Sequence, residues 1–130
     1  MEILRIYINI GECLEVVSGE ETVRMLLFDG SCDGDFFKGT ILPGGVDTQR
    51  IAADGTGTLS ARYMLKGTDY KNQPCSIFIE NKAQTGGERT ETIPKLVTDS
   101  EALKWLETAE LKGSLEHVDG QLTIVIRTEE

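Results

Sequence analysis

Hydrophobic and polar residues alternate along most of this chain, in short runs that glycine and aspartate interrupt. In the first run, Ile6, Ile8 and Ile10 fall on one face of an extended strand, and the residues between them fall on the other. Runs of this kind, rich in β-branched and aromatic residues, are typical of half-buried strands. We therefore predict strands over residues 3–10, 12–17, 22–28, 36–42, 46–53, 58–66, 75–81, 115–118 and 121–128.

Glycine marks several of the breaks between these runs. Asp119-Gly120 is the strongest hairpin signal, because this pair readily adopts the positive φ angles of a type I′ turn. Gly11 predicts a bulge between the first two runs. Pro43-Gly44-Gly45 predicts a turn, and residues 84–92 are predicted to form a loop.

Residues 100–111 fit two interpretations. Ser100 can cap a helix in which Leu103 and Leu106 share a face. Alternatively, Trp105 belongs to a long β segment that continues into the next predicted strand. The local pattern leaves both interpretations open.

The strand count predicts an all-β fold. About eight to ten short strands in a chain of 130 residues are typical of a barrel or a sandwich. Closure into a barrel removes exposed strand edges, and a barrel of about eight strands can enclose one small ligand. With 39% hydrophobic and 27% charged residues, we expect residues 1–130 to form one domain that needs no disulfide or metal for stability.

Charge and cysteine usage exclude several classes of partner and location. The net charge is −9, with −4 in residues 1–21 and −5 in residues 99–130. Such a surface repels nucleic acid and anionic membranes, so neither is expected as a partner. Three widely spaced cysteines predict free thiols in a reducing cytoplasm. We see no signal peptide and no apolar run long enough to span a membrane.

The sequence predicts neither a metal site nor a cofactor. With a single histidine, His117, a zinc site of the usual Cys/His kind is not expected. Residues 29–35 resemble the start of a calcium loop, but Thr40 stands where a bidentate acid is needed. We interpret this stretch as a polar turn.

The strongest candidate site follows the turn at Pro43. Gly44 and Gly45 permit unusual backbone angles and a close approach by another group. Asp47 and Gln49 come two residues apart on the next strand, and so share one face. A carboxylate and an amide converge there if that face lines a cavity; otherwise both are solvated.

A second pair of candidates lies in the middle of a later strand. Arg62 and Tyr63 are adjacent and therefore face opposite sides. Tyr63 shares its face with apolar neighbours, so we predict that it lies in the core with its hydroxyl hydrogen-bonded. Arg62 is then either outside the fold or the buried partner of a carboxylate such as Asp47 or Glu80.

Several of these segments together resemble a known family. They are the run from Gly39 through Leu42-Pro43-Gly44-Gly45-Val46-Asp47 to Gln49, Asp54-Gly55, Leu59-Ser60-Ala61-Arg62-Tyr63, and Asp69. This set is similar to domain-of-unknown-function family 3237, also called uncharacterised protein family 0311, from about Glu12 to the end. Thr48 and the short region 82–92 depart from the family's pattern, so a ligand site lined by them would differ.

The resemblance implies a cytoplasmic antiparallel β-barrel, lipocalin-like in appearance, with no established activity. It also implies that Trp105-Leu106 belongs to a strand. We adopt that expectation over the local helix propensity, which is a weak guide.

Three functions are compatible with these observations. The one we favour is a small-molecule-binding barrel with a polar site near one mouth. Arg62 would make the ligand a small anionic or other polar metabolite. The predicted ligand-binding residues are Gly45, Asp47, Gln49, Arg62 and Glu80.

The second function is that of a cofactor-independent isomerase or lyase. Asp47 would be the general base, and Arg62 or Tyr63 would stabilise the developing oxyanion. The third is an acidic interaction protein that acts as a homo-oligomer, which a barrel interior filled by side chains would favour. We expect a homo-oligomer in any case.

Overall fold

Antiparallel strands form nearly all of the structure. The computed structural model describes residues 1–85 and 91–128. The strands are β1 (Glu2–Val17), β2 (Glu21–Asp33), β3 (Phe37–Ile41), β4 (Val46–Ala52), β5 (Gly57–Asp69), β6 (Pro74–Thr85), β7 (Glu91–Thr98), β8 (Leu111–Val118) and β9 (Gln121–Thr128), and a 3₁₀ helix, η1, covers Lys104–Glu107.

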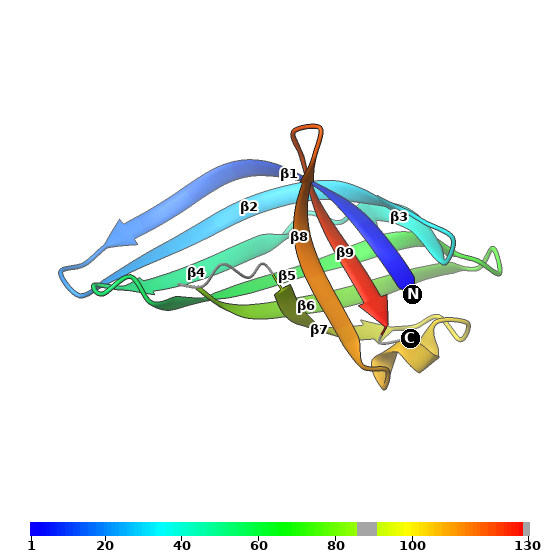
Figure 1. Cartoon of the computed structure of the whole chain (residues 1–130). Helices are drawn as coiled ribbons and strands as arrows, with labels where there is room; N and C mark the ends of the chain where they lie inside the picture. Colours follow the sequence, from blue (N-terminus) through cyan, green and yellow to red (C-terminus); the bar gives the residue numbers. More distant parts are fainter. Residues whose placement is uncertain (86–90, 129–130) are drawn as a thin grey trace.

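The sheet closes on itself as a barrel. Around it, β1 pairs with β9, followed by β8, β7, β6 and β5, and β2 completes the ring by pairing again with β1 (Figure 1). β3 and β4 lie end to end between β2 and β5, so nine strands occupy eight positions. The predicted antiparallel barrel is therefore confirmed. No helix of the described residues is long and apolar enough to cross a membrane.

Two local predictions are confirmed. β1 is a single strand of 16 residues, and its register with β2 shifts between Ile10 and Cys13, which places a bulge at Gly11. At the β8–β9 hairpin, Asp119 and Gly120 have φ angles of 52° and 81°, as a type I′ turn requires. These features were predictable because they depend on residues adjacent in sequence.

One strand escaped prediction. β7 alternates between exposed residues, such as Ile93 and Val97, and buried ones, such as Pro94 and Leu96. Each face mixes polar and apolar residues, so no period of two is visible, and a proline within the run disfavours a strand. The predicted loop over residues 84–92 is wrong at its described ends, which belong to β6 and β7, while residues 86–90 lie outside the described residues.

The strand expected at Trp105-Leu106 is also wrong, since both residues lie in η1. The local helix signal was closer to the truth. Ser100 Oγ accepts the backbone N–H of Leu103 at 3.2 Å, as a capping serine does, and donates to Asp69 Oδ2 at 2.6 Å. These contacts anchor the start of a turn too short for an α-helix.

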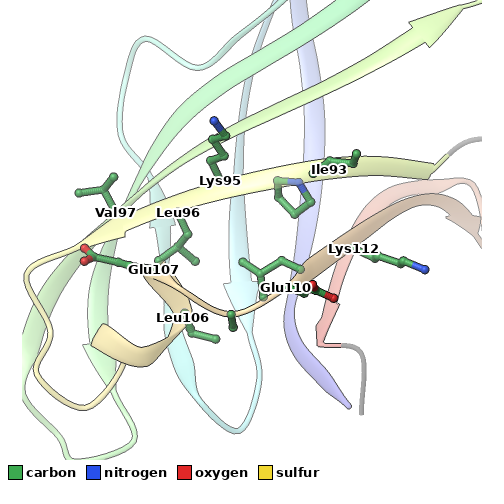
Figure 2. A pocket seen from close by; sticks show the side chains of 11 residues that line it. Ile93, Lys95, Leu96, Val97, Leu106, Glu107, Glu110 and Lys112 are labelled. Atoms are coloured by element: carbon green, nitrogen blue, oxygen red, sulfur yellow. The ribbon is translucent and has the colours of Figure 1, made fainter.

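The turn around η1 closes the barrel where two strands diverge. β7 and β8 pair only at Glu91–Ser114 and Thr92–Gly113. Beyond that point Leu103 and Leu106 fill the gap, and both are fully buried. Figure 2 shows Leu106 projecting from η1 beside the chain that enters β8, and this residue contributes to the lining of an open groove between β7 and that chain. Burial of these two leucines explains why this segment does not continue as a strand.

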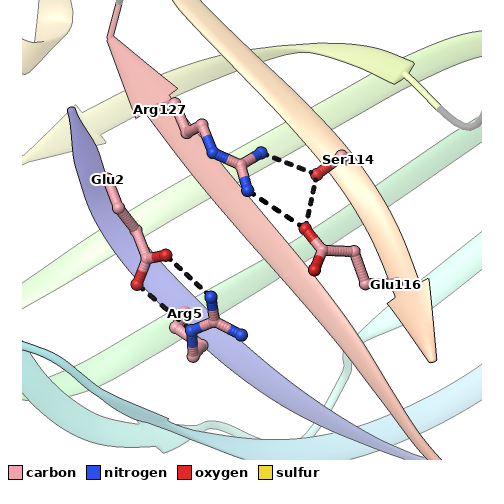
Figure 3. Close-up of polar contacts among 5 residues, drawn as sticks. All are labelled: Glu2, Arg5, Ser114, Glu116 and Arg127. Atoms are coloured by element: carbon pink, nitrogen blue, oxygen red, sulfur yellow. Dashed lines mark hydrogen bonds and ion pairs between the residues drawn. The ribbon is translucent and has the colours of Figure 1, made fainter. Parts of the chain in front are cut away.

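The outer surface of β9 is also covered. Thr123 and Val125 point outward yet are fully buried. Beside them, Arg127 donates to Ser114 Oγ at 2.9 Å and to Glu116 Oε2 at 3.1 Å. The bond from Arg127, and after it the bond that the Ser114 hydroxyl donates to Glu116 Oε2 at 3.1 Å, lower the pKa of the Glu116 carboxyl. Figure 3 shows this network and the neighbouring ion pair of Arg5 with Glu2 on β1.

A substitution at Leu106 tests the role of η1. We expect Leu106→Ala to lower the free energy of unfolding by about 2–4 kcal/mol, because it leaves a cavity among buried side chains. The matched control is Leu14→Ala on β1, where 47% of the leucine is exposed, and the expected loss is under about 1 kcal/mol. Urea denaturation measures both. Equal losses would show that η1 does not close the core.

Candidate functional site

A cavity of about 260 Å³ lies inside the barrel. Its lining is mainly apolar and comes from eight strands, β1, β2 and β4 to β9. The apolar residues are Ile8, Ile10, Leu26, Phe28, Leu59, Ala61, Ala83, Leu115, Leu122 and Ile124, and the polar ones are Asp47, Gln49, Asn81 and Thr92. Ala61 and Ala83 are inward positions on neighbouring strands, so their small side chains help to leave this part of the interior hollow.

The connection between β3 and β4 positions the acidic residue of this cavity. Thr40 pairs with Ser31 of β2, and Val46 pairs with Leu27 of the same strand. Thr40 and Val46 are six positions apart, whereas their partners are four positions apart. The connection between β3 and β4 therefore contains two extra residues. Gly44 adopts a φ of 113°, which side chains disfavour. Asp47, which immediately follows the first residue of β4, then points inward.

Gly45 contributes by close packing. A Cβ atom at this position would lie 2.8 Å from the carbonyl oxygen of Phe28. The glycine therefore lets β4 lie against β2, and the amide of Phe28 donates to the carbonyl of Gly45 at 3.1 Å. Phe28 lines the cavity, but Gly45 does not.

The Asp47 carboxylate is only half satisfied. Its Oδ2 accepts a hydrogen bond from Gln49 Nε2 at 3.2 Å. Its Oδ1 is buried and has no hydrogen-bond partner, the only such side-chain atom among the residues that the structure describes. Burial raises the pKa of Asp47, and the bond from Gln49 offsets part of that effect. Of the two alternatives for the face shared by Asp47 and Gln49, a cavity wall or a solvated surface, the structure has the cavity wall.

A second polar group lies on the cavity wall. Asn81 Nδ2 donates to the Tyr63 hydroxyl at 3.4 Å, and Thr92 Oγ1 donates to Asn81 Oδ1 at 3.4 Å. Tyr63 is 2% exposed and makes an edge-to-face contact with Phe28, at 5.4 Å between ring centroids. Burial, the main cause, raises the pKa of Tyr63. Its predicted place in the core, with a bonded hydroxyl, is confirmed, but it does not line the cavity.

Sequence reasoning missed Asn81 and Thr92. For Asn81 a signal existed, because Cys75, Ile77 and Ile79 precede it at every second position and are buried. A polar residue that continues such an inward series is a candidate for the cavity wall. Thr92 could not be found in this way, since its strand was not recognised.

Besides Gly45 and Tyr63, two further predicted site residues do not line the cavity, because they lie on the outer face of the barrel. Ala61 is the inward partner of Asp47, so the adjacent Arg62 faces outward and is exposed. Glu80 is the β6 partner of Arg62 on the same outer face and lies 3.8 Å from Lys82. The buried ion pair considered for Arg62 is absent from the described residues.

The fold and its cavity define a class of protein, a closed antiparallel barrel that is hollow at one end. Within that class, the family described as a protein of unknown function, DUF3237, matches residues 2–90. This match covers more than half of the chain, so the chain belongs to that family. The match begins earlier than the resemblance suggested and leaves the last 40 residues outside it.

Known relatives agree with this assignment. A UPF0311 protein of Clostridium acetobutylicum is 33% identical over 98 residues, which span 62% of this chain and 60% of that protein. A solved protein of unknown function from C. acetobutylicum has a TM-score of 0.79 at 22% identity, covering 97% of this chain and 93% of the other. A β-barrel-like protein from Acinetobacter baumannii has a TM-score of 0.79 at 17% identity, and the alignment covers 98% of this chain and 92% of the other.

A third solved neighbour is described as an enzyme from Penicillium herquei. Its TM-score is 0.75 at 18% identity, covering 98% of this chain and 92% of the other. These likenesses to solved structures support the fold.

The raised pKa of Asp47 predicts a pH-dependent effect on stability. The folded chain holds this proton more tightly than the unfolded chain, so the ionised form costs stability as the pH rises above the ordinary pKa of 3.8. We expect Asp47→Asn to melt at a higher temperature than the wild type at pH 7, with the difference shrinking as the pH falls toward 4.

Asp54→Asn is the control of opposite sign. Hydrogen bonds from the Thr56 hydroxyl, at 2.6 Å, and from its backbone N–H, at 3.0 Å, lower the pKa of Asp54. Its ionised form therefore stabilises the fold at neutral pH. Calorimetry from pH 4 to 8 measures both variants, and a lower melting temperature for Asp47→Asn at pH 7 would contradict the assignment.

Proposed function

We propose that this protein binds a small, mainly apolar molecule inside its barrel, with Asp47 as the orienting polar contact. The observation that supports this is the buried Oδ1 of Asp47, which lacks a hydrogen-bond partner in a mainly apolar cavity. An unsatisfied buried polar atom costs about 1–3 kcal/mol, and more when charged. A ligand that donates a hydrogen bond to this atom recovers that cost.

The volume suggests the size of the ligand. Pockets for drug-sized molecules span about 300–1,000 Å³, and an apolar cavity of about 150 Å³ can hold benzene. At about 260 Å³ this cavity suits a single ring with a short substituent. An interaction protein would be favoured by a barrel filled with side chains. The hollow interior of this barrel therefore supports small-molecule binding more than that hypothesis.

Toluene tests whether the cavity accepts a ligand. We expect a titration to shift the methyl resonances of Ile8 and Ile124 saturably, because both line the cavity. Ile93 is 72% exposed, does not line the cavity, and serves as the reference signal. NMR spectroscopy of the full chain with labelled isoleucine methyls measures all three.

Two alanine substitutions show where binding occurs. Ala61→Phe places a ring in the cavity and should weaken toluene binding about tenfold or more, because the ligand and the new side chain compete for one volume. Ala52→Phe adds the same ring at an exposed position on β4 and should leave affinity unchanged. Equal binding to both variants would disprove an interior site.

Proton-transfer catalysis at Asp47 is a second candidate. The raised pKa of this carboxyl and its unbonded oxygen favour it. The fungal neighbour described as an enzyme adds a likeness of fold. Arg62 and Tyr63, considered earlier as oxyanion stabilisers, do not line the cavity, so a stabilising amide would have to come from Gln49 or Asn81.

Hydrogen exchange tests this second candidate. If Asp47 acts as a base, acetophenone in D₂O should lose its α-protons faster with the protein than without it. Asp47→Asn should abolish the acceleration, because an amide cannot take up the proton, and Asp54→Asn should retain it. NMR integration of the methyl signal gives the rate, and an equal rate for both variants would exclude Asp47 as the base.

A further inference from the structure

The cavity also carries information on the chemical class of its ligand, an inference that rests on the proposed function. We infer that it selects an apolar ring bearing a hydrogen-bond donor, either a hydroxyl or a protonated amine, and rejects carboxylates. Two observations lead to this: the buried side-chain atom that lacks a hydrogen-bond partner among the described residues is an acceptor, and the lining lacks a cation.

The polar side chains of the cavity differ in whether their hydrogen-bonding atoms have partners. Gln49 donates to Asp47 Oδ2, Thr92 donates to Asn81, and Asn81 donates to Tyr63, which lies behind the wall. Each of these donor groups therefore has at least one protein acceptor, although an amide NH2 carries a second N–H. Asp47 Oδ1 is the atom without a partner, and it can only accept while the carboxyl is ionised.

Charge in and around the cavity disfavours an anion. Among the described residues that line it there is no lysine, arginine or histidine. Arg24 is the β2 partner of Gln49 and faces the same way, but it does not line the cavity, and its guanidinium pairs with Glu15. A carboxylate ligand would therefore lose its hydration without gaining a cation, beside an existing negative charge.

A donor group reverses each of these penalties. A hydroxyl supplies the missing hydrogen bond to Asp47, and a protonated amine supplies both the bond and a compensating charge. The expectation of an anionic ligand depended on Arg62, which lies on the opposite face of β5. We therefore expect the same ring to bind more tightly when it carries a hydroxyl or a protonated amine than when it carries a carboxylate.

Four probes that share one ring test this selectivity: toluene, benzyl alcohol, benzylamine, which is protonated at pH 7, and benzoate. The readout is the methyl titration of Ile8 and Ile124 in the full chain. We expect benzyl alcohol and benzylamine to bind about tenfold more tightly than toluene, which is the effect of one good hydrogen bond. Benzoate should bind more weakly than toluene.

Two variants separate the source of the selectivity. Asp47→Asn keeps an acceptor but removes the charge, so benzylamine should lose about tenfold in affinity, while benzyl alcohol changes by less than about threefold. Arg62→Ala should leave every probe within about twofold of the wild type. If Asp47→Asn fails to fold, the order of the four probe affinities for the wild-type protein still tests the inferred ligand class.

The outcomes distinguish the two levels of the hypothesis. If no probe shifts the cavity methyls, toluene included, the proposed function itself is wrong. If toluene binds but benzoate binds as tightly as benzylamine, binding stands and the inferred ligand class is wrong. Loss of benzoate binding in Arg62→Ala would also overturn the inference, since it would show that an anion reaches that side chain.

Discussion

The alternation of side chains along closed strands is the constraint on which this structure depends. Once the sheet closes, every second residue must enter a shared interior and its neighbours must remain outside. This rule separates Asp47, which faces Ala61 across the strand pair, from Arg62, which is one residue further along. Two charges that look close in the sequence therefore end on opposite sides of the sheet.

The barrel is uneven along its length. At one end, large side chains such as Phe37 fill the interior, and Leu103 and Leu106 seal the gap between β7 and β8. At the other end, Ala61 and Ala83 occupy inward positions and a cavity remains. A packed end that supplies stability allows the hollow end to keep a carboxylate with one unsatisfied oxygen.

That carboxylate gives the cavity its chemical character. Burial without a cation makes the ionised form costly, and one hydrogen bond from Gln49 compensates only in part. Natural proteins seldom retain such a group for stability alone, because an apolar residue of similar size costs less. The proposed role in binding or proton transfer would account for its presence at an inward position.

The sequence by itself determined the strands with visible alternation, the Asp119-Gly120 turn, the bulge at Gly11 and the shared face of Asp47 and Gln49. Each depends on neighbours in the chain, whose geometry a local pattern encodes. Only the tertiary structure decided that this face is the interior, that Asn81 and Thr92 meet there, and that residues 104–107 form a 3₁₀ turn. Those outcomes depend on which strands become neighbours and on which gaps must be filled, and a pattern of period two carries no information on either.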